Sequence, residues 1–146
     1  HAMVPFHGQG MNCAFEDCLA LVDAIENAEN WNDAISAYET ARRENAAAIQ
    51  TMALENYVEM RDKVDDSRFL LERTLERELA DRHPDRFIPR YSMVSFQRVS
   101  YAVALHRGRI QRGILARLCE GISDIAQVDY ALASEMIHRE LEPLHA

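Results

Sequence analysis

The chain has 146 residues and a formal net charge of −8. It has the size of one domain, and its negative charge gives no general attraction to nucleic acid or to an anionic membrane. Its three cysteines form no Cys-x-x-Cys pair, which argues against a disulfide framework or a metal site and favours free thiols in a reducing compartment such as the cytoplasm. No apolar run approaches the roughly 18 residues of a membrane-spanning helix. We therefore expect a soluble protein, and the start at His1 without a methionine indicates a fragment or a processed piece.

Residues 11–83 are helical in character. From Met11 to His83 there is neither glycine nor proline, and no stretch alternates with the period of a strand. The spacing predicts a first helix over about residues 12–28 and a long second helix from about residue 31 toward residue 63. The expected buried stripe of the first helix is Ala14, Cys18, Leu21, Val22 and Ile25. The expected apolar face of the second is Ile35, Tyr38, Ile49, Met52, Ala53 and Met60.

The second half continues the helical pattern with more interruptions. Asp65, Asp66 and Ser67 offer caps for a third helix, which His83-Pro84 should end, and residues 84–89 read as a loop. Residues 90–97 are ambiguous between a short extended segment and irregular chain. Residues 100–120 predict another helix with Gly121 as a C-cap, and residues 127–141 a last one that ends before Pro143. The expected fold is all-α, with about five helices.

Two glycines stand directly ahead of the first predicted helix. Gly8 and Gly10 would allow a ligand to touch the main chain, and the unpaired amides of a helix start favour an acceptor. Because Glu16 and Asp17 should already offset the helix dipole, a neutral polar edge such as the pyrimidine side of a flavin fits better than a phosphate. An ordinary turn remains the alternative, since Cys13 occupies the third glycine position of a dinucleotide motif and no strand precedes it.

Three further residues raise the same question of ligand or packing. Asn56 falls on the apolar face of the second helix, where an unpaired buried amide would cost about 1–3 kcal/mol. Its partner is either another part of the protein or a polar ligand held against Met60, with Glu59 at the edge of the face. Tyr91 could be a packed aromatic residue or a wall of a pocket. His7 is an ordinary loop imidazole on local grounds, and the remaining histidines show no zinc-like spacing.

Longer segments carry a resemblance to a known family. The segments HAMVPFHGQGMN (residues 1–12) and FEDC (residues 15–18) resemble the second flavin-binding motif of the aromatic-hydroxylase group of FAD monooxygenases. NYVEMR (residues 56–61) and FIPRYSMVSF (residues 87–96) are similar to signature segments of the branch that hydroxylates L-kynurenine. In this family NADPH reduces FAD, a flavin C4a-hydroperoxide forms with O2, and oxygen is transferred to the aromatic ring.

The resemblance implies a role for each matching residue. The flavin would be faced by Pro5, Gly8, Gln9, Gly10, Met11 and Asn12. Phe6 and His7 would line the space between flavin and substrate ring. Asn56 and Tyr91 would hydrogen-bond the substrate carboxylate, with Glu59 and Met60 close by. No residue of the chain would act as a catalytic acid or base, because the cofactor supplies the chemistry.

The resemblance also implies a division of the chain and a missing partner. Residues 1–30 would end the FAD-binding domain, and residues 31–146 would line and cover the substrate pocket. The Rossmann half of the larger α/β enzyme would be absent, as would a membrane anchor, so the fragment alone should neither retain FAD tightly nor turn over. The alternatives are a related hydroxylase for another aromatic acid and a helical interaction domain without enzymatic activity.

Overall fold

The computed structural model describes residues 3–62 and 66–144, and across these residues every regular element is a helix. The predicted all-α fold is therefore confirmed for the described part of the chain. Contacts divide the chain into two compact units, the first ending at Val58 and the second beginning at Glu59. The predicted division at residue 30 concerns ligand contacts and stays a prediction.

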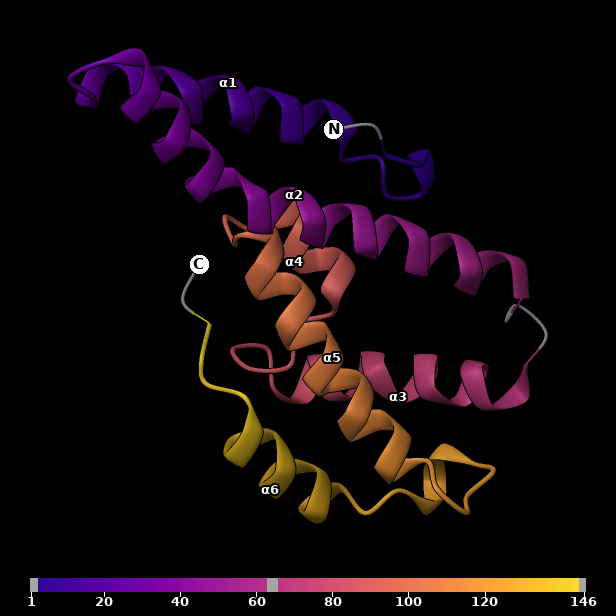
Figure 1. The fold of residues 1–146 in the computed structure, drawn as a ribbon. Helices are drawn as coiled ribbons and strands as arrows, with labels where there is room; N and C mark the ends of the chain where they lie inside the picture. Colours follow the sequence, from indigo (N-terminus) through magenta and orange to yellow (C-terminus); the bar gives the residue numbers. More distant parts are fainter. Residues whose placement is uncertain (1–2, 63–65, 145–146) are drawn as a thin grey trace. The chain divides into compact units, whose positions relative to one another are not determined.

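The first unit contains a short 3-10 turn and two helices (Figure 1). The turn η1 spans Pro5–His7, α1 spans Gly10–Asn27, and α2 spans Trp31–Asp62, so that most of α2 lies in this unit. Arg42 of α2 holds α1, since its Nε lies 2.5 Å from Asp17 Oδ1 and its Nη2 lies 3.0 Å from Glu16 Oε2. The side chains of Arg42 and Asp17 are only 13% and 10% exposed, so this ion pair is a buried tie between the two helices.

The expected buried faces of these helices are partly wrong. On α1 the buried residues are Cys13, Asp17 and Ala24, whereas Val22 and Ile25 are 52% and 40% exposed. Periodicity identifies an apolar stripe but not the surface that covers it, and here the ion pair with Arg42 turns a different face toward α2. On α2 the buried members of the expected face are Ile49, Met52 and Ala53, while Ile35 and Met60 are exposed.

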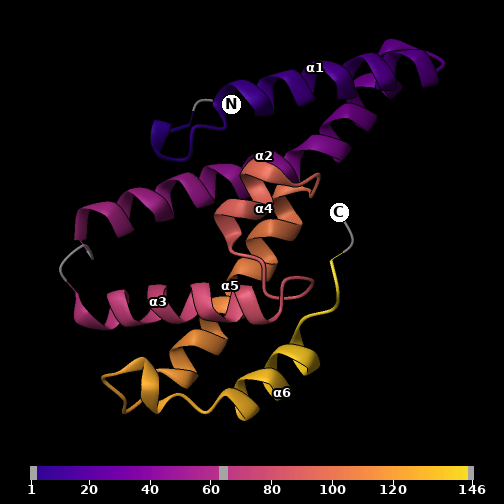
Figure 2. The ribbon, with the colours of Figure 1, turned by 180° about the vertical axis from the view of Figure 1, so that it is seen from behind.

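The second unit is built around α5, which spans Tyr101–Leu118 and contacts α3, α4 and α6 (Figures 1 and 2). Helix α3 spans Ser67–Arg82 and α6 spans Tyr130–Glu140. Side chains from these helices and from the segments between them form one apolar core. Its fully buried members include Leu75, Leu79, Phe87, Ile114 and Ile137.

Side-chain caps set several helix starts in this unit. The carboxylate of Asp66 accepts from the amides of Arg68 and Phe69 at the start of α3, as predicted. Of the other two expected caps, Ser67 is the first residue of the helix and Asp65 lies outside the described residues. Ser100 caps α5 in the same way, and Asp129 caps α6. Each cap satisfies amides that have no partner within the helix, which fixes where the helix begins.

Three sequence expectations in this unit need correction. Residues Arg90–Phe96 form the helix α4 and are not extended, because Met93 and Val94 on one side of this short helix are buried. The last helix begins at Tyr130, since residues Ile125–Gln127 form a separate 3-10 turn, η2, closed by a capping box. Helix α5 ends at Leu118, and Gly121, with φ of 74°, follows in the next turn. Of the helices in the described ranges, none is long and apolar enough to cross a membrane.

Candidate functional site

Gly8 and Gly10 differ in how far the structure explains them. Gly8 has φ of 70° and its amide donates to the Pro5 carbonyl at 3.3 Å, so the left-handed conformation of the η1 turn requires a glycine. Gly10 is the first residue of α1, and a Cβ added there would meet Met3 at 3.8 Å, which is an ordinary van der Waals distance. The described fold therefore explains Gly8 and gives no reason for Gly10.

The start of α1 presents bare main-chain donors. The first helical hydrogen bond is donated by the Cys13 amide to the Gln9 carbonyl at 2.9 Å, so the amides of Gly10, Met11 and Asn12 precede it. No described side chain caps this end, because the Gln9 carboxamide oxygen instead accepts from Asn12 Nδ2 at 2.8 Å. The helix start is therefore suited to an external acceptor.

The expectation that Glu16 and Asp17 offset the dipole of this helix is wrong. The first turn of α1 contains no acidic residue, and both carboxylates are paired with Arg42. Burial alone would lower the pKa of Arg42, but the hydrogen bonds that Arg42 donates to Asp17 and Glu16, together with their negative charges, raise it above its ordinary value. The positive end of α1 is thus less compensated than the sequence alone suggests.

Cys13 sits in the first turns of α1 but has the character of a buried thiol. Burial, followed by the charge of Asp17, raises the pKa of Cys13. Its sulfur accepts from Arg42 Nη2 at 3.7 Å. A raised pKa disfavours the thiolate that a nucleophile needs, so Cys13 serves packing.

The C-terminal part of α2 holds the η1 turn inside the first unit. Asn56 Nδ2 donates to the Phe6 carbonyl, and the rings of Phe6 and Tyr57 lie 4.6 Å apart at 35°. His7 and Gln9 are buried, with 6% and 7% exposure. The structure thus brings the glycine turn and Asn56 together, and the amide of Asn56 has a partner within the protein.

The other predicted site residues belong to the second unit. Glu59 is buried, and its two carboxylate oxygens lie 2.9 Å from Arg73 Nη2 and 3.0 Å from Arg112 Nη2. Met60 is 58% exposed. Tyr91 is 56% exposed and its ring packs edge to face with Phe96 at 6.1 Å. Glu59 is therefore tied to two arginines, while Met60 and Tyr91 present accessible side chains.

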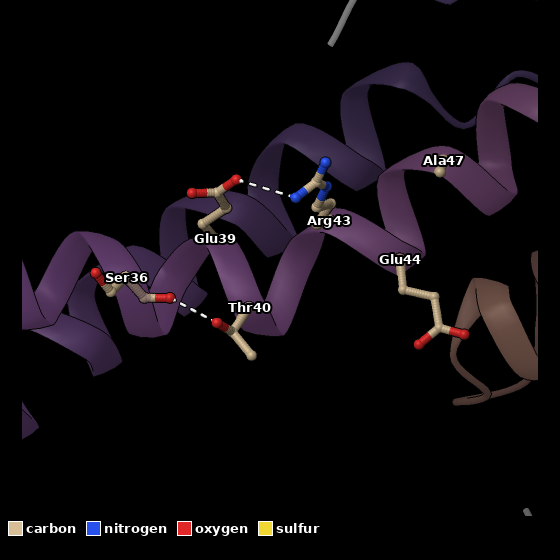
Figure 3. Close-up of a pocket in the computed structure, with 6 residues that line it drawn as sticks. All are labelled: Ser36, Glu39, Thr40, Arg43, Glu44 and Ala47. Atoms are coloured by element: carbon tan, nitrogen blue, oxygen red, sulfur yellow. Dashed lines mark hydrogen bonds and ion pairs between the residues drawn. The ribbon is translucent and has the colours of Figure 1, made fainter.

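A surface hollow of about 630 Å³ lies elsewhere, along the N-terminal half of α2 (Figure 3). It is open and lined by one helix, where Arg43 pairs with Glu39 at 3.6 Å and the Thr40 hydroxyl donates to the Ser36 carbonyl at 2.8 Å. None of the predicted site residues lines it. We therefore regard this hollow as ordinary surface.

Sequence reasoning missed the residues that hold the predicted ones in place. Arg42, Tyr57, Arg73 and Arg112 all contact a predicted or neighbouring residue through their side chains. Tyr57 could have been suspected from its place beside Asn56. Nothing local marks the arginines, because their partners lie 14 to 53 residues away.

In the described part of the chain, the η1 turn with Gly8 thus leads into a helix start without a side-chain cap. No protein-family model matches the chain. It is 56% identical over 144 residues to the kynurenine 3-monooxygenase of Xanthomonas axonopodis pv. citri, and 56% identical to that of Xanthomonas oryzae pv. oryzae. The corresponding Xanthomonas campestris pv. campestris protein is 54% identical. These matches confirm the resemblance seen in the sequence.

The matched region is nearly the whole of this chain but a minor part of each relative. It covers 99% of this chain and 32% of each of these proteins. The chain therefore spans about a third of the length of the curated relatives it matches.

Proposed function

We propose that this chain is the C-terminal third of an FAD-dependent monooxygenase that uses NADPH and O2 to convert L-kynurenine to 3-hydroxykynurenine. The observation that carries the proposal is the 56% identity to kynurenine 3-monooxygenase, which extends over 144 residues and so includes the glycine turn, α2 and α4. The complete enzyme would include a Rossmann portion that this chain lacks. It would work in the cytoplasm, a reducing compartment that keeps thiols free and contains NADPH.

The residues at the start of α1 fit an FAD ring. The amides of Gly10, Met11 and Asn12 stand ahead of the first helical hydrogen bond and can donate to a carbonyl edge. Gly10 leaves the main chain bare where the fold itself does not require it. When bound, FAD reduced by NADPH would supply the oxygen-transfer chemistry.

The chain's own residues would bind, orient and exclude water. Phe6 and His7 on the η1 turn would lie between flavin and substrate ring. The Asn56 amide donates to the Phe6 carbonyl, so contact of Asn56 with the substrate would also fix the turn that faces the ring. In this proposal Tyr91 supplies a phenol to the substrate carboxylate, and Met60 an apolar wall.

Glu59 would contribute to substrate binding indirectly, through its ion pairs with Arg73 and Arg112. Both of its oxygens are already engaged by Arg73 and Arg112, so its contribution to substrate binding would be to orient the end of α2. A buried carboxylate that is paired with two arginines has mainly a structural role.

The experiment is a chimera in which this chain replaces the matching third of the Xanthomonas axonopodis relative. We expect bound FAD, NADPH oxidation that depends on L-kynurenine, and 3-hydroxykynurenine as the product by mass spectrometry. The 146-residue chain alone should show neither flavin absorbance nor turnover. A folded chimera with FAD that hydroxylates only another aromatic acid would overturn the substrate, and a folded chimera without FAD would overturn the enzymatic proposal.

A further inference from the structure

The short helix α4, which carries Tyr91, has little within itself to fix its position. It has seven residues, and Pro89 ahead of it provides no side-chain cap. A helix of this length is not stable through its own hydrogen bonds, and its buried residues are Met93 and Val94. The place of α4 therefore depends on α5, against which it packs (Figure 2).

Two buried residues of α5 hold the chain just ahead of Tyr91. Gln111, which is only 2% exposed, donates from Nε2 to the Ile88 carbonyl at 2.8 Å. Earlier on α5, the buried Gly108 allows a close approach, because an added Cβ would lie 2.7 Å from Cδ and 3.2 Å from Cβ of Arg90. Helix α5 thus holds the chain at residues 88 and 90, and Tyr91 is the next residue.

Stability does not explain the carboxamide of Gln111. Its Oε1 is buried and has no hydrogen-bond partner among the described residues. A buried acceptor without a partner costs about as much as one hydrogen bond contributes, or more, so the net gain from this polar group is small at best. An apolar side chain of the same size would at most leave the Ile88 carbonyl without a donor in place of Oε1. What the glutamine adds is direction, because a hydrogen bond fixes where that carbonyl lies.

We propose that Gln111 is a positioning residue for Tyr91. The inference rests on the proposed function, in which the Tyr91 phenol contacts the substrate carboxylate. Tyr91 lies in the first turn of α4, three residues after the held carbonyl, and is 56% exposed. The start of α4 therefore sets where the phenol points. Because Gln111 is buried, it acts through the chain and not by contact with the substrate.

The first measurement is hydrogen–deuterium exchange of the full-length chimera, with or without FAD. Gln111→Met keeps the length and bulk of the side chain and removes the donor. We expect the amides of α4 to exchange at least about fivefold faster, while those of α6 and the urea midpoint stay as in the parent. His106→Met is the matched control, because His106 is an exposed residue of the same helix; it should leave exchange in α4 unchanged.

The second measurement is the KM of the chimera for L-kynurenine. Gln111→Met should raise this KM at least about tenfold, since a misplacement of about 1 Å in a positioned group can cost up to about 100-fold. The FAD dissociation constant should not change. In a Tyr91→Phe background the same substitution should change KM by less than about twofold, because the hydroxyl that it displaces is already absent. A merely structural role would affect both backgrounds equally.

Gly108→Ala tests the same contact without removing the hydrogen-bond donor. The added methyl group would push Arg90 away from α5, so exchange in α4 and KM should rise as they do for Gln111→Met. Gly113→Ala is the matched control, because an added Cβ meets nothing within 4 Å there. If Gln111→Met does not fold, Gly108→Ala decides the proposal by the same two readouts.

The outcomes separate this inference from the proposed function. Unchanged exchange in α4, or an equal rise of KM in the Tyr91 and Tyr91→Phe backgrounds, would overturn the positioning role in a chimera that still hydroxylates L-kynurenine. A lower urea midpoint of Gln111→Met without a specific change in α4 would make Gln111 an ordinary packing residue and overturn it too. A folded parent chimera that does not hydroxylate L-kynurenine would sink the proposed function, and faster exchange in α4 of its Gln111→Met variant would still support the hold on Tyr91.

Discussion

The buried ion pair between Arg42 and Asp17 should be a main stabilising contact of the first unit. The informative change is Arg42→Met, which keeps the aliphatic bulk and removes the charge. In the structure Arg42 Nε lies 2.5 Å from Asp17 Oδ1, and the two side chains are 13% and 10% exposed. The substitution would take the Arg42 guanidinium away from the buried Asp17 carboxylate and from Glu16.

The magnitude follows from this burial. Removing one partner of a buried pair costs about 3–5 kcal/mol, because the remaining charge stays buried and loses the attraction of that partner. We expect the lower end, about 3 kcal/mol, since Glu16 is 47% exposed and Arg42 keeps its hydrophobic contacts as methionine. The loss should appear as a lower urea midpoint of the helical signal of the 146-residue chain.

Two further variants make the assay specific. Arg43→Met is the matched control, because Arg43 is 81% exposed and its pair with Glu39 spans 3.6 Å, so it should change stability by less than about 0.5 kcal/mol. Adding Asp17→Asn to Arg42→Met should recover part of the loss, giving a coupling energy above about 1 kcal/mol. An Arg42→Met variant as stable as the Arg43→Met control would refute the reasoning.

Three other predictions concern Glu59, His83 and Tyr57. Glu59→Gln should lower the free energy of unfolding by about 1–2 kcal/mol in urea without any ligand, because the arginines that bind Glu59 are nearly half exposed; no loss would mean that Glu59 has only a ligand role. Burial and the neighbouring His138 lower the pKa of His83 below its ordinary value of 6.5, so the unfolded chain binds the extra proton first and stability should fall as pH drops from about 7.5 to about 5.5. His83→Gln should remove most of that slope, and an unchanged slope would contradict the assignment. Tyr57→Ala should weaken FAD binding by the chimera about tenfold through loss of the 4.6 Å contact with Phe6, whereas Tyr57→Phe should not; equal effects would argue against ring packing as the cause.

Local patterns predicted most of the helices of the described chain and the Asp66 cap of α3. Asp66, Ser100 and the prolines at 84 and 143 mark element ends that the structure keeps within a few residues. Helix α4 was ambiguous because seven residues are too short for a periodic pattern, and burial of Met93 and Val94 decides it. The apolar stripe predicted for the first helix is periodic, yet the sequence could not say that the described chain leaves its members Cys18, Val22 and Ile25 exposed.

The site could be predicted only in its local parts. The glycine turn and the helix start are consecutive residues, and their sequence shows them directly. The partner of Asn56 is the Phe6 carbonyl, 50 residues away, and the pairing of Arg42 with Asp17 spans 25 residues. Such contacts depend on how helices are placed, which residue spacing within one helix does not encode.

The central claim is that bare main chain at the start of α1 holds the flavin, and Gly10→Ala tests it most directly. An added Cβ meets Met3 only at 3.8 Å, so the 146-residue chain should keep its stability or gain up to about 1 kcal/mol in urea. Gly113→Ala on α5, where an added Cβ meets nothing within 4 Å, is the matched control. The account predicts that FAD binds the Gly10→Ala chimera at least about tenfold more weakly while the Gly113→Ala chimera keeps its affinity. An unchanged FAD dissociation constant in a folded Gly10→Ala chimera would contradict it.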